Sequence, residues 1–295
     1  MKHTASPAGR PLVNHEPDDR PTAAGTPADP AQHGLFPGYV KASIAVHAGA
    51  AALSAAVPTA WPWALGAIAA NHLAITAAGL WPRSRWLGAN ITRLPDAAAA
   101  RGEIAITIDD GPDPEVTPAV LDLLDVHATK ASFFCIASAA ARHPVLCREI
   151  VRRGHSVQNH SDRHSHGFSL LGPRAMRAEI ASAQVRLSDI TGTPPRFFRA
   201  PAGLRNPFLA PVLQALDLRL VSWTRRGFDT QARTAEAVLK RLVHRLAGGD
   251  ILLLHDGHAG RTADGRPLVL AVLPALLSHA EAAKLHSVTL PAALA

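Results

Sequence analysis

The chain has 295 residues, 47% of them hydrophobic, which is enough apolar surface for one large domain or two small ones. Its net charge of +7 comes mostly from scattered arginines, without a basic run interleaved with aromatic residues, so the sequence argues against nucleic acid as a partner. The two cysteines lack the spacing of a zinc site or a redox pair, and we expect both in the core.

Composition divides the chain into three parts. Residues 1–36 are rich in Pro, Ala, Gly, Asp and His, show no apolar periodicity, and are predicted to form a disordered tail. Residues 37–86 contain a long uncharged stretch. From residue 101 to 295 short apolar runs alternate with helical patterns, as expected of a folded catalytic domain.

The uncharged stretch covers residues 42–81, which contain no Lys, Arg, Asp or Glu. A turn over 58–63 splits it into two apolar helices. Trp61 and Trp63 at this turn, and Trp81 and Trp86 at the end of the second helix, suit the depth of a membrane interface. We therefore predict a membrane-associated helical hairpin. The alternative is a pair of soluble Ala-rich helices, because Ala is barely apolar and the stretch also holds His47, Asn71 and His72.

Charges beside this stretch bear on orientation in a bacterial-type inner membrane. Lys41, Arg83 and Arg85 would place both ends of a hairpin on the cytoplasmic side by the positive-inside rule. A lipid-linked sugar would then be the accessible substrate. A single span would instead put the catalytic domain outside, facing cell-wall glycan.

The catalytic domain shows a regular alternation of strands and helices. A helical pattern follows each of the first six predicted strands, and this order predicts a parallel α/β sheet, open or closed, with its site at the carboxyl ends of the strands. The predicted strands are 103–109, 130–136, 156–161, 196–201, 219–224, 250–256 and 286–290.

The first chemical motif is Asp109-Asp110-Gly111-Pro112, at the end of the apolar run from Ile104 to Ile108. Because side chains alternate along a strand, we expect the two carboxylates to diverge, so that one binds a metal while the other takes a proton from water. The same residues are also ordinary turn chemistry at a helix entry.

A histidine pair follows at the end of the third predicted strand. His160 and His164 are four residues apart, a spacing at which two imidazoles can meet one cation, and neutral imidazole is a common zinc ligand. Surface histidines, or histidines that hold a strand end by hydrogen bonds, are the alternative. Combined with an aspartate from another strand end, the pair favours a metal site.

Three more strand ends carry candidate residues. Arg199 can bring a fixed positive charge to Asp109, although an arginine that bridges a helix end would look the same. Asp229 adds a carboxylate beyond the aromatic Trp223. His255 ends a fully apolar strand, the arrangement that a general acid requires.

Together these motifs resemble the NodB-homology polysaccharide deacetylases, carbohydrate esterase family 4, over roughly residues 101–290. The resemblance implies a distorted (β/α)7 barrel, here preceded by the tail and the apolar hairpin. Five motifs occur in the family order: Thr107–Pro112, His160–His164, Arg199–Pro201, Asp229 and Leu253–Asp256.

The resemblance also implies a role for each residue. Asp109 is the catalytic base, Arg199 orients it, and His255 is the acid, tuned by Asp229. One divalent metal, zinc with cobalt, nickel or manganese as alternatives, is held by Asp110, His160 and His164. The implied reaction is removal of an N-acyl group, in the family acetyl, from an amino sugar of a glycan or a lipid-linked sugar.

Other functions remain open at this stage. A lipid-linked sugar deformylase would share the fold, two histidines and one carboxylate also form the triad of non-haem iron oxygenases, and an inactive barrel could bind glycans. The chain departs from the family at two positions. Ala202 stands where an aromatic residue is usual, and Phe228-Asp229 replaces an Asp-Trp pair, so the wall around the acyl group differs.

Overall fold

The computed structural model describes residues 38–295, together with Met1. The predicted tail, residues 1–36, therefore lies outside the described residues except for Met1.

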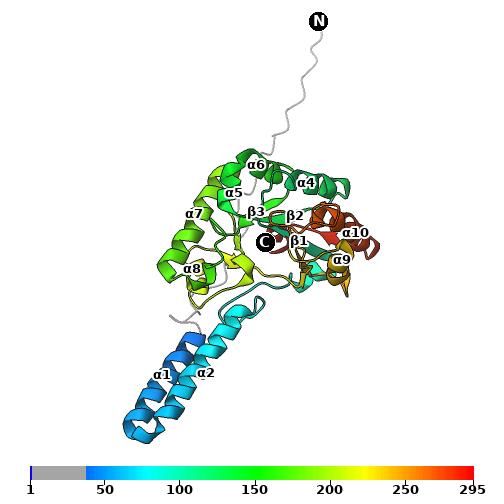
Figure 1. Cartoon of the computed structure of the whole chain (residues 1–295). Helices are drawn as coiled ribbons and strands as arrows, with labels where there is room; N and C mark the ends of the chain where they lie inside the picture. Colours follow the sequence, from blue (N-terminus) through cyan, green and yellow to red (C-terminus); the bar gives the residue numbers. More distant parts are fainter. Residues whose placement is uncertain (2–37) are drawn as a thin grey trace. The chain divides into compact units, whose positions relative to one another are not determined.

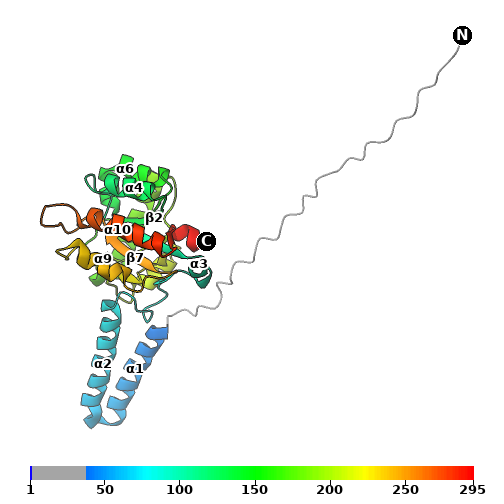
Figure 2. The same ribbon diagram turned by 90° about the vertical axis from the view of Figure 1, so that its right-hand side faces the viewer.

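Two helices, α1 (Gly38–Ala56) and α2 (Trp61–Leu80), precede the catalytic domain and are joined by the short turn η2 (Pro58–Ala60). They pack side by side (Figures 1 and 2). Asn71 Nδ2 donates to Ser43 Oγ at 2.9 Å, and His47 Nδ1 lies 2.7 Å from the Ser43 carbonyl oxygen. Asn71 and Ser43 thus join the two helices, whereas His47 is satisfied within α1.

The two helices differ in apolarity. Within the described residues, the helix Pro58–Leu80 alone is long and apolar enough to cross a membrane, and only 17% of its apolar window is buried. Helix α1 has 19 residues but does not reach the same apolarity, because eight of them are alanines and the rest include Lys41, Ser43 and His47.

The catalytic domain is built on an eight-stranded parallel sheet with helices packed around it (Figure 1). The strand order is β5-β4-β3-β2-β1-β7-β6, and β8 pairs with the start of β1. The strands are β1 (Glu103–Asp109), β2 (Ala131–Cys135), β3 (Ser156–Asn159), β4 (Phe197–Phe198), β5 (Arg219–Leu220), β6 (Arg225–Arg226), β7 (Ile251–His255) and β8 (His286–Ser287).

This sheet confirms the predicted α/β barrel class, with one difference. The strand predicted over 219–224 is only the two-residue β5, which pairs with β4, and the next strand, β6, begins just after this range and pairs with β7. Residues 221–224 carry the chain from one edge of the curled sheet to the other, and Thr224 N already donates to the Ile251 carbonyl of β7 at 2.9 Å. Sequence periodicity cannot reveal such a change of partner because both halves are extended.

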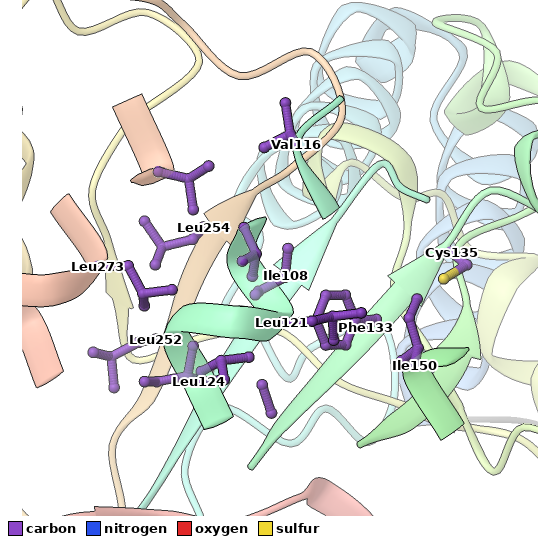
Figure 3. Packing of buried hydrophobic residues seen from close by; sticks show 14 of the residues in the cluster. Ile108, Val116, Leu121, Leu124, Phe133, Cys135, Ile150, Leu252, Leu254 and Leu273 are labelled. Carbon is purple, nitrogen blue, oxygen red and sulfur yellow. The ribbon is translucent and has the colours of Figure 1, made fainter. Parts of the chain in front are cut away.

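Side chains along the strands alternate between two layers. Ile104, Ile106 and Ile108 of β1 face the outer helices, in a core that includes Phe133 and Leu254 (Figure 3). The residues between them face the inside of the curled sheet, where Ala105, Phe134 and Leu253 pack with Trp223. Asp109 and His255 occupy inward positions of this pattern, so the sheet directs both toward its interior.

The helices cover the outer face of the sheet (Figures 1 and 2). Helix α7 buries one apolar face containing Met176, Ile180, Ala183 and Leu187, and its C-cap is Gly192 with φ of +72°. The helices are α3 (Asp96–Ala100), α4 (Thr117–Val126), α5 (Ala137–Arg142), α6 (Pro144–Arg152), η3 (Phe168–Leu170), α7 (Pro173–Thr191), η4 (Pro201–Gly203), α8 (Leu209–Gln214), α9 (Ala235–Val243), α10 (Leu268–Ala282) and α11 (Leu290–Ala293).

Candidate metal and acid–base site

The register of the central strands brings two predicted site residues side by side. Asp109, the last residue of β1, is the direct partner of His255, the last residue of β7. Both side chains are buried, with exposed fractions of 3% and 6%. A candidate base and a candidate acid therefore stand on neighbouring strand ends.

The expected divergence of Asp109 and Asp110 is wrong. Asp110 has φ of +76°, so the chain leaves the strand geometry there and the alternation of faces stops. As a result both carboxylates approach His160 Nε2, with Asp109 Oδ2 at 3.8 Å and Asp110 Oδ1 at 3.2 Å. The two aspartates thus serve the same site from adjacent positions.

Asp110, His160 and His164 form a group that could hold a metal ion, with one ligand atom from each residue lying within 4.8 Å of the others. Asp110 Oδ1 faces Nε2 of His160 at 3.2 Å and Nε2 of His164 at 3.3 Å. These contacts lack hydrogen-bond geometry, and the oxygen is buried without a partner among the described residues. One carboxylate oxygen and two imidazoles around an unsatisfied point fit a divalent transition metal such as zinc.

The surroundings of the two histidines shift their protonation in opposite directions. His160 Nδ1 lies 2.8 Å from the Arg199 carbonyl oxygen, which can only accept, so Nδ1 carries a hydrogen and Nε2 is the nitrogen that faces the two aspartates. Burial lowers the pKa of His160, but Asp109 and Asp110 outweigh it, so the pKa is raised overall. Burial and the nearby His160 lower the pKa of His164 to about 4, against the attraction of Asp110. His164 can therefore present a free nitrogen near neutral pH, whereas at His160 a metal ion would compete with a proton for Nε2.

Arg199 is almost fully buried, at 1% exposure, and makes contacts in several directions. Its Nη1 donates to Asp109 Oδ1 at 2.6 Å and to Thr107 Oγ1 at 2.7 Å, and its guanidinium lies 4.0 Å from the centre of the Phe134 ring. Burial lowers the pKa of Arg199, and the charge of Asp109 opposes that effect. Such a restrained cation fixes one oxygen of Asp109 and leaves the other to face His160.

Asp229 and His255 form a second buried pair. Asp229 Oδ1 lies 2.9 Å from His255 Nδ1, and Asp229 Oδ2 accepts from the backbone N–H of His255 at 2.8 Å. Burial lowers the pKa of His255, but the hydrogen bond and charge of Asp229 outweigh it, so the pKa is raised overall. With Nδ1 committed to Asp229, Nε2 is the nitrogen left for a substrate.

The structure adds three residues that the sequence reasoning missed. Thr107 supports Arg199, as described above. His258 Nδ1 lies 3.5 Å from Asp110 Oδ2, and its ring stacks on that of His164 with 6.3 Å between centroids. Only the fold reveals this contact, because the loop after β7 bends back over the metal residues.

The third residue is Asp256, which is buried against the first motif. Thr117 Oγ1 donates to Asp256 Oδ2, and burial raises the pKa of Asp256 to about 7. A Cβ atom on Gly111 would lie 2.4 Å from either Asp256 carboxylate oxygen, so the first and fifth motifs meet too closely for any other residue at position 111. The feature of the sequence that could have pointed to Asp256 is its position next to His255.

The loop after β4 forms one wall of the candidate site. Ala202 has φ of +54°, and the N–H groups of Gly203 and Leu204 are used by the carbonyls of Ala200 and Pro201. The N–H of Ala202 is therefore a candidate donor to a developing oxyanion. At the other departure from the family pattern, Phe228 is 43% exposed and stacks near Arg226 and Arg241.

Comparison with known proteins agrees with this geometry. The family model described as polysaccharide deacetylase matches residues 96–221. A chitooligosaccharide deacetylase of Azorhizobium caulinodans is 36% identical over 158 residues, which are 53% of this chain and 75% of that protein. A peptidoglycan-N-acetylglucosamine deacetylase of Bacillus cereus is 32% identical over 161 residues, 54% of this chain and 75% of that protein.

Solved structures share the fold. A family 4 carbohydrate esterase from Streptomyces lividans superposes with a TM-score of 0.57 at 30% identity, covering 63% of this chain and 91% of that one. A carbohydrate esterase family 4 pseudoenzyme from Bacillus anthracis reaches 0.62 at 19% identity, over 70% of this chain and 69% of that one, so the fold alone does not establish catalysis. This chain belongs to the NodB-homology polysaccharide deacetylases, carbohydrate esterase family 4, which are hydrolases of amide carbon–nitrogen bonds.

Proposed function

We propose that this protein removes an N-acetyl group from N-acetylglucosamine units of a glycan or a lipid-linked sugar. The observation that carries the proposal is the register pair Asp109 and His255, each held by its own buried partner, beside the group Asp110, His160 and His164. The names of the relatives from Azorhizobium caulinodans and Bacillus cereus support the same substrate unit.

The metal would be held by Asp110, His160 and His164. When bound, a divalent ion such as zinc supplies Lewis acidity to a carbonyl group and lowers the pKa of water. The Nδ1 hydrogen bond from His160 to the Arg199 carbonyl fixes the ring that offers its Nε2 lone pair, the usual device by which proteins orient a ligand histidine.

The remaining residues would divide the proton transfers between them. Asp109 Oδ2, which is not bonded to Arg199, accepts the proton from the attacking water. His255 Nε2 donates a proton to the leaving nitrogen, since an amine anion is a very poor leaving group. The Ala202 N–H stabilises the negative charge that develops on the carbonyl oxygen.

Different observations bear on each of the three alternative functions. The family to which the chain belongs and the two buried acid–base pairs argue against an iron oxygenase, which needs neither Asp109 nor His255. The same pairs argue against an inactive glycan-binding barrel. A deformylase acting on a lipid-linked sugar keeps support because Ala202 and Phe228 change the wall around the acyl group.

We further propose that α1 and α2 anchor the protein in a membrane. They bear exposed apolar side chains that a folded soluble helix pair would bury, among them Trp63, Leu65 and Leu73 at 77%, 57% and 70% exposure. Lys41, Arg83 and Arg85 favour the cytoplasmic side for the barrel. Protease added to intact spheroplasts checks the side, and cleavage of the barrel by external protease would contradict it.

The function is tested with the purified full-length protein in detergent, loaded with zinc. Released amine and released acid are measured on chitotetraose and on N-acetyl and N-formyl forms of one amino sugar. We expect acetate release from the N-acetyl forms, lost in Asp109→Asn. Activity on the N-formyl form alone would support the deformylase, and no acid from any substrate would support the inactive barrel.

A further inference from the structure

The base of the helical hairpin is docked on the loop that follows β4. The carbonyl of Gly79, in the last turn of α2, accepts a hydrogen bond from Arg205 N at 3.2 Å. A Cβ atom on Gly79 would lie only 2.3 Å from the Arg205 carbonyl oxygen. The last turn of α2 therefore approaches this loop more closely than any side chain would allow.

The segment after α2 continues along the same wall. The Pro82 carbonyl accepts from Ser222 Oγ at 2.7 Å, and Arg83 Nη1 donates to the Thr224 carbonyl at 3.3 Å. Pro82 also packs on Gly203, where an added Cβ would lie 2.9 Å from the Pro82 Cβ. The segment thus touches the loops after both β4 and β5, and the first of these loops carries the third motif.

These contacts reach the proposed base through few steps. Arg199 Nη1 donates to Asp109 Oδ1 at 2.6 Å, and its Nη2 donates to the Ser222 carbonyl at 3.0 Å. Ser222 Oγ then donates to the Pro82 carbonyl at 2.7 Å. Pro82 lies two residues beyond the end of α2, so the hairpin base is a supporting part of the wall of the site.

The same short segment carries the marks of a membrane interface. Trp81 and Trp86 are 62% and 71% exposed, and Arg83 and Arg85 are exposed beside them at the end of the uncharged stretch. Helix α2 is about 30 Å long, close to the thickness of the hydrocarbon core. A bilayer around α2 would therefore end at residues 81–86.

We propose that the loops after β4 and β5 lie at the bilayer surface and that the substrate is an amino sugar joined to a lipid of that bilayer. This rests on the proposed function and narrows its substrate class. A sugar joined to a lipid phosphate is held at headgroup depth, level with these loops. Arg83 and Arg85 supply cations for the phosphates of such a carrier.

The position of the loops is tested first, by fluorescence quenching. Full-length Phe208→Cys and Val126→Cys are labelled with a fluorophore and reconstituted in phosphatidylcholine–phosphatidylglycerol vesicles containing headgroup-nitroxide lipid. Phe208 lies just after the docked loop and is 45% exposed, whereas Val126 ends α4 on the far side of the barrel from the hairpin and is 80% exposed (Figures 1 and 2). Cys135 and Cys147 are buried and should not react. We expect strong quenching at position 208 alone, and equal quenching at both positions would overturn the proposal.

The substrate class is tested on the same vesicles. Deacetylation of N-acetylglucosaminyl diphosphate polyprenol in the bilayer is compared with that of soluble chitotetraose at equal bulk concentration. We expect kcat/KM to be at least about tenfold higher for the lipid-linked substrate. Enzyme and substrate held in the same bilayer have a raised effective concentration, and a gain of this size lies within what such tethering provides. Equal or faster turnover of chitotetraose would overturn the proposal, while no turnover of either substrate would instead contradict the proposed function.

A matched pair of glycine variants distinguishes the effect of α2 docking on the loop after β4 from the effect of membrane attachment alone. Gly79→Ala introduces the close contact with Arg205, whereas Gly66→Ala, in the same helix, adds a Cβ with nothing within 4 Å. We expect Gly79→Ala to stay in vesicles but to lose most of the ratio of lipid-linked to soluble kcat/KM, and Gly66→Ala to keep it. An unchanged ratio in Gly79→Ala would show that the docked geometry has no part in substrate choice.

Discussion

The site contains two kinds of polar cluster that differ in how their atoms are satisfied. Asp109 with Arg199, and Asp229 with His255, are ion pairs in which Asp109 Oδ1 and both oxygens of Asp229 receive hydrogen bonds of 2.6 to 2.9 Å from the chain itself. In the third cluster, Asp110 Oδ1 faces two imidazole nitrogens and has no hydrogen-bond partner among the described residues.

This difference separates what the fold supplies from what a ligand must supply. A buried carboxylate oxygen without a donor is costly, and a cation between it and two imidazole lone pairs would remove the cost. The two ion pairs need no such ion. The proposed base and acid are therefore positioned by folding, whereas the group Asp110, His160 and His164 would be completed by a metal ion from solution.

The largest effect is expected where the metal group is broken. Asp110→Ala, His160→Ala and His164→Ala should lose bound metal and turnover together, because each removes a proposed ligand. Asp109→Asn should keep its metal and lose turnover by roughly 10² to 10⁴. Elemental analysis and acetate release on the four purified variants measure both. A metal-free Asp109→Asn with metal-loaded alanine variants would reverse the assignment.

An intermediate effect is expected from breaking the acid pair at its imidazole. His255→Asn should leave attack on the carbonyl intact, yet lower amide hydrolysis by roughly 10² to 10⁴. An activated ester needs no proton on its leaving group, so the ratio of ester to amide turnover should rise. Asp109→Asn is the control that should lower both substrates alike. Equal loss on both substrates in His255→Asn would make it a structural residue or a ligand.

The smallest effect is expected from removing the charge behind His255. Asp229 raises the pKa of His255, so the protonated acid persists to higher pH and activity should fall as pH rises through that raised value. Asp229→Asn removes the attraction, and the falling limb of the pH profile should move to lower pH by about 1 to 3 units. The profile of kcat/KM measures it, and a shift to higher pH would mean that another group sets this limb.

Much of the fold could be predicted because strands and helices alternate with regular periods. A strand lies within each of the seven predicted ranges, and the longest of them, β1, β2 and β7, contain the apolar runs on which the prediction rests. The exchange of partners between β5 and β6 could not be predicted, since pairing depends on which neighbours the curled sheet brings near. The roles given to Asp109, Asp110, His160, His164, Arg199, Asp229 and His255 stay predictions until the variants are measured.

The sequence by itself determined which chemical groups stand at strand ends, because a period of two and a parallel order send the ends of β1 and β7 to one edge of the sheet. Tertiary structure decided how those groups meet. The positive φ of Asp110 turns it toward His160, and the loop after β7 brings His258 to the same carboxylate. Docking of Gly79 on Arg205 likewise joins the hairpin to the site. Such contacts depend on close packing between segments far apart in the chain, which no local pattern records.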